Sequence, residues 1–110
     1  MKQFLLLMTT GLLIACGNVT GQANFNERID IIEQHLAEED WNNLQEQGNL
    51  LKKLYDDQQW KIQLLGDEGE YEGLNIGINR FLKAIEEEAM MEAKLELATI
   101  QSLIDDIYSL

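Results

Sequence analysis

Apolar residues recur at alternating spacings of three and four along most of the chain after residue 24. Because about 3.6 residues make one helical turn, this spacing places apolar side chains on one face of an α-helix. The clearest stripe predicts a helix over about 41–65. Its members are Trp41, Leu44, Gly48, Leu51, Tyr55, Gln58, Ile62 and Leu65, and we expect Leu50, Leu54 and Leu64 to widen it. Gly48 is unfavourable inside a helix, so it predicts a close approach of a second helix there.

Three further segments show the same spacing. The pattern predicts one helix over about 26–37 with Asn26 as its N-cap, one from Glu70 or Asn75 to Glu86, and one over about 88–108. Their expected core residues are Phe25, Ile29, Ile32 and Leu36, then Leu74, Ile78, Phe81, Leu82 and Ile85, then Met90, Ala93, Leu97, Ile100, Ile104 and Ile107. The run Gly66-Asp67-Glu68-Gly69 predicts a turn between the two halves.

The two halves of this helical region resemble each other. A shift of 49 positions aligns Asn26 with Asn75, Glu38-Glu39 with Glu87-Glu88, and Asp56-Asp57 with Asp105-Asp106. The alignment predicts two similar hairpins, each a short helix followed by a longer one. We therefore expect an all-α protein, a compact antiparallel four-helix bundle.

The start of the chain has a different pattern. Lys2 is followed by an apolar run from Phe4 to Ile14, which is too short to span a bilayer and typical of a signal peptide. Leu13-Ile14-Ala15-Cys16 resembles the bacterial lipobox, in which the cysteine thiol receives a diacylglyceryl group and a peptidase cuts before it. We therefore predict a signal peptide over 1–15, a lipidated flexible tether over 16–24 and a helical domain over 25–110.

Lipidation at Cys16 predicts an extracytoplasmic location on the cell membrane, because two acyl chains anchor a protein stably. Cys16 is also the only cysteine, so a disulfide within the chain is excluded. The chain has 20 acidic residues against 8 basic ones, and every acidic residue follows Cys16. Such a surface repels phosphate backbones, so nucleic acid is not an expected partner. The acidity is most simply explained by solubility and leaves cationic ligands open.

The sequence offers few groups for chemistry. His35 is the only histidine, and Glu38 and Glu39 follow it at spacings suited to a metal pair on a continuous helix, but a solvated histidine near a helix C-terminus is the favoured explanation. Asp67, Glu68, Glu70 and Glu72 surround the central turn, but their spacing does not fit an EF-hand. No nucleophile–base pair is recognisable. We expect no cofactor, no metal site and no enzymatic activity.

The aromatic residues allow two interpretations. Trp41 and Tyr55 fall on the main stripe, where a core position is the simpler reading and a ligand groove the alternative. Trp60 falls between Gln58 and Ile62 and points away from that stripe, since each residue turns about 100° around a helix. It is either partly buried under the Gly66–Gly69 turn or exposed. An exposed Trp60 would be the best candidate for binding a partner or the membrane interface.

The chain resembles a known family in several features. They are Asp40-Trp41 opening a long acidic helix, Trp60 late in that helix, the Gly/Asp turn, and the closing run from Glu92-Ala93 through Leu97-Ala98 to Ile107-Tyr108. These features resemble domain-of-unknown-function family 4363, short membrane-anchored helical proteins of Gram-positive bacteria, over about residues 25–108. The resemblance implies a helical extracytoplasmic domain and no particular activity.

Two functions remain open from the sequence. The first is a non-enzymatic lipoprotein that binds a cell-envelope protein or acts as an adaptor. The second is a small-ligand or cation-binding lipoprotein. A continuous apolar patch around Trp60 would favour the first, whereas a cavity lined by Trp41 and Tyr55, or carboxylates converging near Glu70, would favour the second. The pattern does not predict the oligomeric state.

Overall fold

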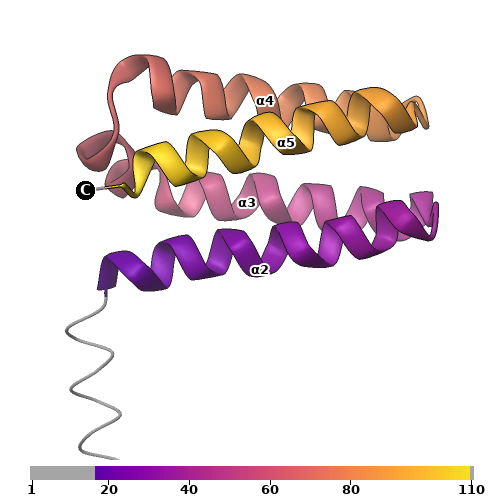
Figure 1. The fold of residues 1–110 in the computed structure, drawn as a ribbon, viewed down its shortest axis with the longest axis horizontal. Coiled ribbons are helices and arrows are strands. Elements are labelled where there is room, and N and C mark those ends of the chain that lie inside the picture. Colours follow the sequence, from indigo (N-terminus) through magenta and orange to yellow (C-terminus); the bar gives the residue numbers. More distant parts are fainter. Residues whose placement is uncertain (1–16, 110) are drawn as a thin grey trace, which may run out of the picture.

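Four helices form an antiparallel bundle in the computed structural model, which describes residues 17–109. They are α2 (Gly17–Ala37), α3 (Trp41–Leu65), α4 (Glu68–Glu86) and α5 (Met90–Ile107). Each helix runs beside the next in the sequence, and α5 returns to lie next to α2 (Figure 1). The start of α2, the end of α3, the start of α4 and the end of α5 therefore share one end of the bundle. The predicted four-helix bundle is confirmed.

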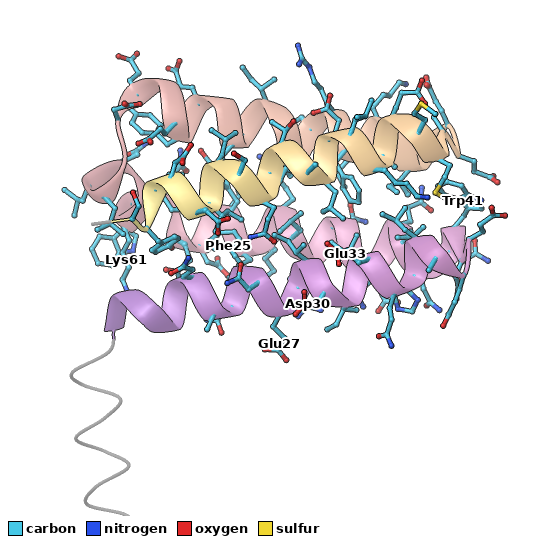
Figure 2. The ribbon with its side chains drawn as sticks, viewed as in Figure 1. Phe25, Glu27, Asp30, Glu33, Trp41 and Lys61 are labelled. Atoms are coloured by element: carbon cyan, nitrogen blue, oxygen red, sulfur yellow. The ribbon has the colours of Figure 1, made fainter. Side chains whose placement is uncertain are left out.

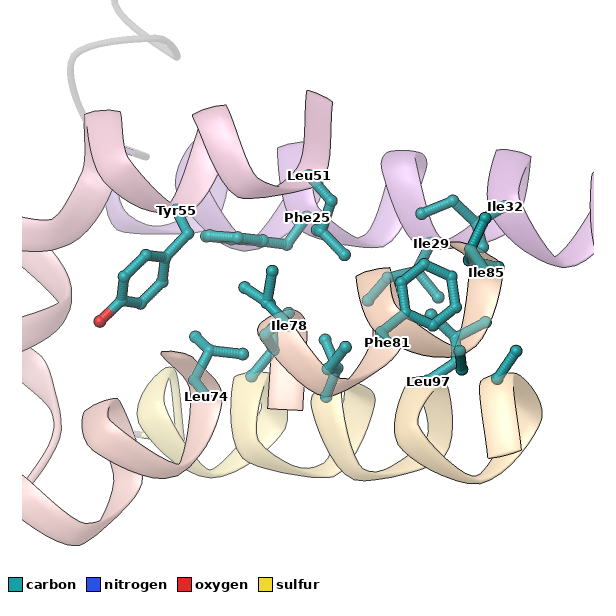
Figure 3. Close-up of a cluster of buried hydrophobic side chains, with 14 of the residues drawn as sticks. Phe25, Ile29, Ile32, Leu51, Tyr55, Leu74, Ile78, Phe81, Ile85 and Leu97 are labelled. Carbon is teal, nitrogen blue, oxygen red and sulfur yellow. The ribbon is translucent and has the colours of Figure 1, made fainter. Parts of the chain in front are cut away.

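The core forms where the apolar stripes of the four helices meet (Figure 3). Almost every residue expected there is buried, with Trp41, Leu54, Leu65, Leu82 and Met90 partly buried at its edge. The expectation for Leu64 is wrong, because this side chain is 78% exposed, and Leu50 is also exposed. Neither residue belongs to the three-and-four stripe of α3, so both side chains lie on its solvent-facing side and not on its core face.

Gly48 fulfils the prediction of a close helix approach. It is buried on the core face of α3, and a β-carbon added to it would lie 2.7 Å from Cδ2 of Leu82 on α4. The missing side chain therefore lets Leu82 pack directly on the α3 backbone.

The first helix begins much earlier than the sequence predicted. Residues 17–24, expected to be a flexible tether, are the first turns of α2, and Asn26 lies inside the helix instead of capping it. Gly21 is buried, and an added β-carbon would lie 2.9 Å from the hydroxyl of Tyr108 at the end of α5. Gly21 is one of the small residues that suggested a flexible tether, but here its missing side chain permits close packing against Tyr108. Asn26 Oδ1 instead accepts a hydrogen bond of 3.1 Å from Gln101 Nε2 on α5.

The two hairpin turns repeat each other, in line with the two similar hairpins that the internal resemblance predicted. The expected longer second helix is found in the first hairpin (21 and 25 residues), but the expectation is wrong for the second, where α4 has 19 residues and α5 has 18. Asp40 N–H donates to the His35 carbonyl at 3.0 Å, and the matching Ala89 N–H donates to the Ala84 carbonyl at 2.8 Å. Between these pairs, Glu39 and Glu88 have positive φ angles of 53° and 52°. This hydrogen-bond pattern, with a left-handed residue just after the helix, is a common helix C-terminal motif. Glycine usually occupies its left-handed position. Equivalent residues in the two halves therefore end α2 and α4 in the same way.

Glu88→Gly is expected to stabilise the protein by about 1 kcal/mol, because a side chain in the left-handed region carries a steric cost that glycine avoids. The gain should appear as a higher denaturation midpoint. Glu87→Gly is the matched control, since Glu87 has an ordinary φ of −88° and its carboxylate lies 3.8 Å from Lys83 Nζ. This variant should gain no stability. Equal shifts for the two variants would contradict the assignment of strain to residue 88.

Candidate functional site

An exposed apolar pair marks the end of α3. Trp60 is 61% exposed and Leu64 is 78% exposed. They lie four residues apart on one helix and therefore share a face, here called the Trp60–Leu64 patch. Lys61 Nζ lies 5.3 Å from the centre of the Trp60 ring. The structure thus selects the exposed alternative for Trp60, and its partial burial under the Gly66–Gly69 turn is wrong.

The position of this patch follows from the length of α3. With 25 residues α3 is the longest helix, and its last turns lie at the end of the bundle where α2 begins. Figure 2 shows Lys61 at that end and Trp41 at the opposite one. The ring of Trp60 points away from the stripe formed by the buried residues Tyr55 and Ile62, so no neighbouring helix covers it.

A groove lies between α2 and α5, with lining residues from both helices. It measures about 510 Å³ and is lined by Glu33, Leu36, Ala37, Lys94, Leu97, Ala98 and Gln101. Its floor is apolar, and opposite charges stand on its two walls. On α5 the surface continues from Ala98 to two exposed apolar side chains, Leu95 (63% exposed) and Met91 (70% exposed). The apolar stripes of the separate helices do not predict this groove, because it depends on the spacing between two helices far apart in sequence.

His35 takes part in a small cluster at the turn between α2 and α3. Ligand-type atoms of His35, Glu38 and Asp40 all lie within 4.8 Å of one another. The sequence had placed Glu39 beside Glu38 on a continuous helix, but Glu39 adopts a left-handed backbone after the helix ends, and Asp40 lies in the cluster instead. Asp40 also caps α3 by accepting hydrogen bonds from the backbone and side-chain nitrogens of Asn43 at 3.3 and 2.6 Å.

The acidic turn before α4 is built for capping. Asp67 Oδ1 accepts from Glu70 N–H at 2.8 Å, and Glu70 Oε1 accepts from Asp67 N–H at 2.9 Å. This reciprocal pair is a capping box, which satisfies free amides at the helix start. The carboxylates of Asp67 and Glu70 therefore stabilise the start of α4, and this capping role explains their position without a bound ion.

The stripe aromatics belong to the core. Tyr55 is buried, and its hydroxyl donates to the Tyr71 carbonyl at 3.3 Å, while Trp41 packs against the core cluster. Burial raises the pKa of Tyr55, and the nearby Asp56 carboxylate raises it further. Burial also raises the pKa of Tyr108. Both phenols therefore stay protonated near neutral pH, which does not suit them to act as general bases.

The predicted lipidation site, Cys16, lies just outside the described residues. Within residues 17–109, none of the helices combines the length and hydropathy needed to cross a bilayer.

Comparison with known proteins gives one result. A family model described as "Domain of unknown function (DUF4363)" matches residues 20–110. No curated protein and no solved structure matches the chain. The match covers all four helices from the first turn of α2 onward. The chain therefore belongs to domain-of-unknown-function family 4363, as the sequence features had indicated.

Proposed function

We propose that this protein is a lipoprotein anchored through Cys16 on the extracytoplasmic face of the cell membrane, where it acts as a non-enzymatic protein-binding or adaptor module. The lipobox directly after an apolar run supports the anchor. The groove between α2 and α5 supports the binding role, and it is the observation on which that role rests.

The chemistry of the groove favours an amphipathic helix of a cell-envelope protein. A groove between two helices with Leu36, Leu97 and Ala98 in its lining suits the apolar face of such a helix. Glu33 on α2 and Lys94 on α5 would meet charges that flank this face. The exposed side chains of Met91 and Leu95 extend the apolar contact beyond the groove.

The binding role can be tested by photo-crosslinking in intact cells that produce the full chain. A photoreactive residue at Ala98 is expected to give one discrete protein adduct, whereas the same residue at the exposed Asn79 on α4 is not. Lys94→Glu should abolish the adduct because it reverses a charge in the groove. Lys53→Glu is the matched control on α3 and should leave it intact. An adduct pattern identical at positions 98 and 79, or insensitive to Lys94→Glu, would refute the proposed site.

The anchor has its own test. Cys16→Ser is expected to leave the protein unlipidated, retained as precursor or shed from the cell, because serine lacks the thiol that accepts the diacylglyceryl group. Detergent partitioning and the mass of the mature N-terminus would measure this. Unchanged partitioning together with an unchanged mass would rule out lipidation at Cys16.

Cation binding is the second candidate, supported by the cluster of His35, Glu38 and Asp40. One imidazole and two carboxylates suit a divalent transition metal such as Zn²⁺. Calorimetric titration of the full chain with Zn²⁺ would show saturable binding that His35→Gln removes. Binding unaffected by that substitution would reject the cluster as the site.

A further inference from the structure

The start of α2 leaves no spacer between Cys16 and the bundle. The helix begins at Gly17, the residue that follows the predicted lipidated cysteine. The buried Gly21 packs against Tyr108 one turn later, so the start of α2 is held against the end of α5. Acyl chains on Cys16 would therefore hold this end of the bundle directly at the membrane surface, whereas a flexible tether would have lifted it away.

The same end carries the Trp60–Leu64 patch. Because α3 runs antiparallel to α2, its final turns lie beside the start of α2 (Figure 1). Trp60 and Leu64 are exposed there, and Lys61 stands next to the Trp60 ring. A large exposed aromatic–aliphatic pair is unfavourable in water unless another apolar phase receives it.

We infer that the Trp60–Leu64 patch inserts into the lipid–water interface of the membrane to which Cys16 is anchored. This inference rests on the proposed lipid anchor. Tryptophan favours the interfacial region, since its ring is apolar and its indole N–H finds polar partners there. Lys61 can extend its ammonium group toward lipid phosphates while its methylene stem lies along the patch. The protein-binding groove between α2 and α5 remains open to a separate partner.

Charge determines the character of this contact. Asp67, in the turn that follows α3, and Glu68, the first residue of α4, are exposed, and anionic headgroups repel such carboxylates. The contact must therefore be mainly apolar, so raising the salt concentration should not release it. It should also be at least as deep in zwitterionic as in anionic lipid.

The chain contains its own depth reference. Trp41 begins α3 and Trp60 lies nineteen residues later. At about 1.5 Å per residue the two rings are about 28 Å apart along the helix. Figure 2 shows Trp41 at the end of the bundle opposite Lys61. Lipid at one end of the bundle would thus reach Trp60 and not Trp41.

The test uses the full lipidated chain in two single-tryptophan forms, Trp41→Phe and Trp60→Phe. Each is reconstituted from detergent into vesicles of brominated phosphatidylcholine, whose bromine atoms quench nearby tryptophan emission. We expect Trp60 to be quenched several-fold more strongly than Trp41. Adding Leu64→Glu to the Trp41→Phe chain should reduce the quenching of Trp60. The exposed, distant Met91→Glu is the matched control and should not.

The outcomes separate the inference from the proposed function. Weak and equal quenching of both tryptophans, with the protein still bound to the vesicles, would overturn the insertion of the patch and leave the anchor standing. The patch would then be free to take a protein partner. Strong and equal quenching of both tryptophans would also overturn the inference, because lipid would then contact both ends of the bundle and not only the end that carries Trp60. A chain that fails to stay with the vesicles would overturn the anchor itself.

Discussion

Leu51→Ala is expected to lower the free energy of unfolding by about 2–5 kcal/mol, the usual cost of truncating a buried leucine. Leu51 is fully buried at the middle of α3 and belongs to the core cluster with Phe25 and Ile78 (Figure 3). Its loss removes apolar contacts and leaves a cavity, because the bundle can relax only partly around it. Urea denaturation followed by circular dichroism would measure the change.

Glu87→Ala is the control for this prediction. Glu87 is exposed, and its ion pair with Lys83 spans 3.8 Å between two largely solvated side chains. Such pairs contribute at most about 1 kcal/mol, so the denaturation midpoint should barely move. Midpoints that fall equally for Leu51→Ala and Glu87→Ala would show that the core face of α3 is assigned incorrectly.

Gly21→Leu is expected to destabilise the protein by about 1–3 kcal/mol, the range for inserting bulk into a packed site. Even a β-carbon at this position would lie 2.9 Å from the Tyr108 hydroxyl, so a leucine must displace the Tyr108 ring or shift the start of α2. The Tyr108 ring packs against Phe25, with 6.4 Å between the two ring centres. A displaced Tyr108 ring would therefore disturb the buried side chain of Phe25. Thermal denaturation of the full chain would report the loss.

The outcome for Gly21 distinguishes a packed helix from a flexible tether. Ala23→Leu is the matched control, because Ala23 is exposed on the same turn of α2. Leucine there should be neutral within about 0.5 kcal/mol, as for most surface substitutions. If both variants unfold at the wild-type midpoint, residues 17–24 do not pack against α5, and the spacer-free anchor proposed above would lose its basis.

The apolar stripes by themselves determined the fold class and most of the core. A stripe such as Leu44, Leu51 and Ile62 can be buried on one face only if the segment is helical, and this requirement is local. The internal shift of 49 residues predicted two similar hairpins, and the structure shows matching turns around Glu39 and Glu88. Local hydrogen bonds within a few residues set these turns, so the sequence of the turn contains the information.

Only the tertiary structure decided where the functional surfaces lie. Residues 17–24 have the composition of a flexible segment, and Gly21 becomes a packing site only because Tyr108, 87 positions later, lies against it. The pattern within α3 places Trp60 off the core stripe, but only the packed bundle shows that the side chain is left 61% exposed there. The groove between Leu36 and Leu97 depends on the separation of α2 and α5, helices that no short turn connects. Burial along one helix is a local property, whereas closure between distant helices depends on the packing of the whole bundle.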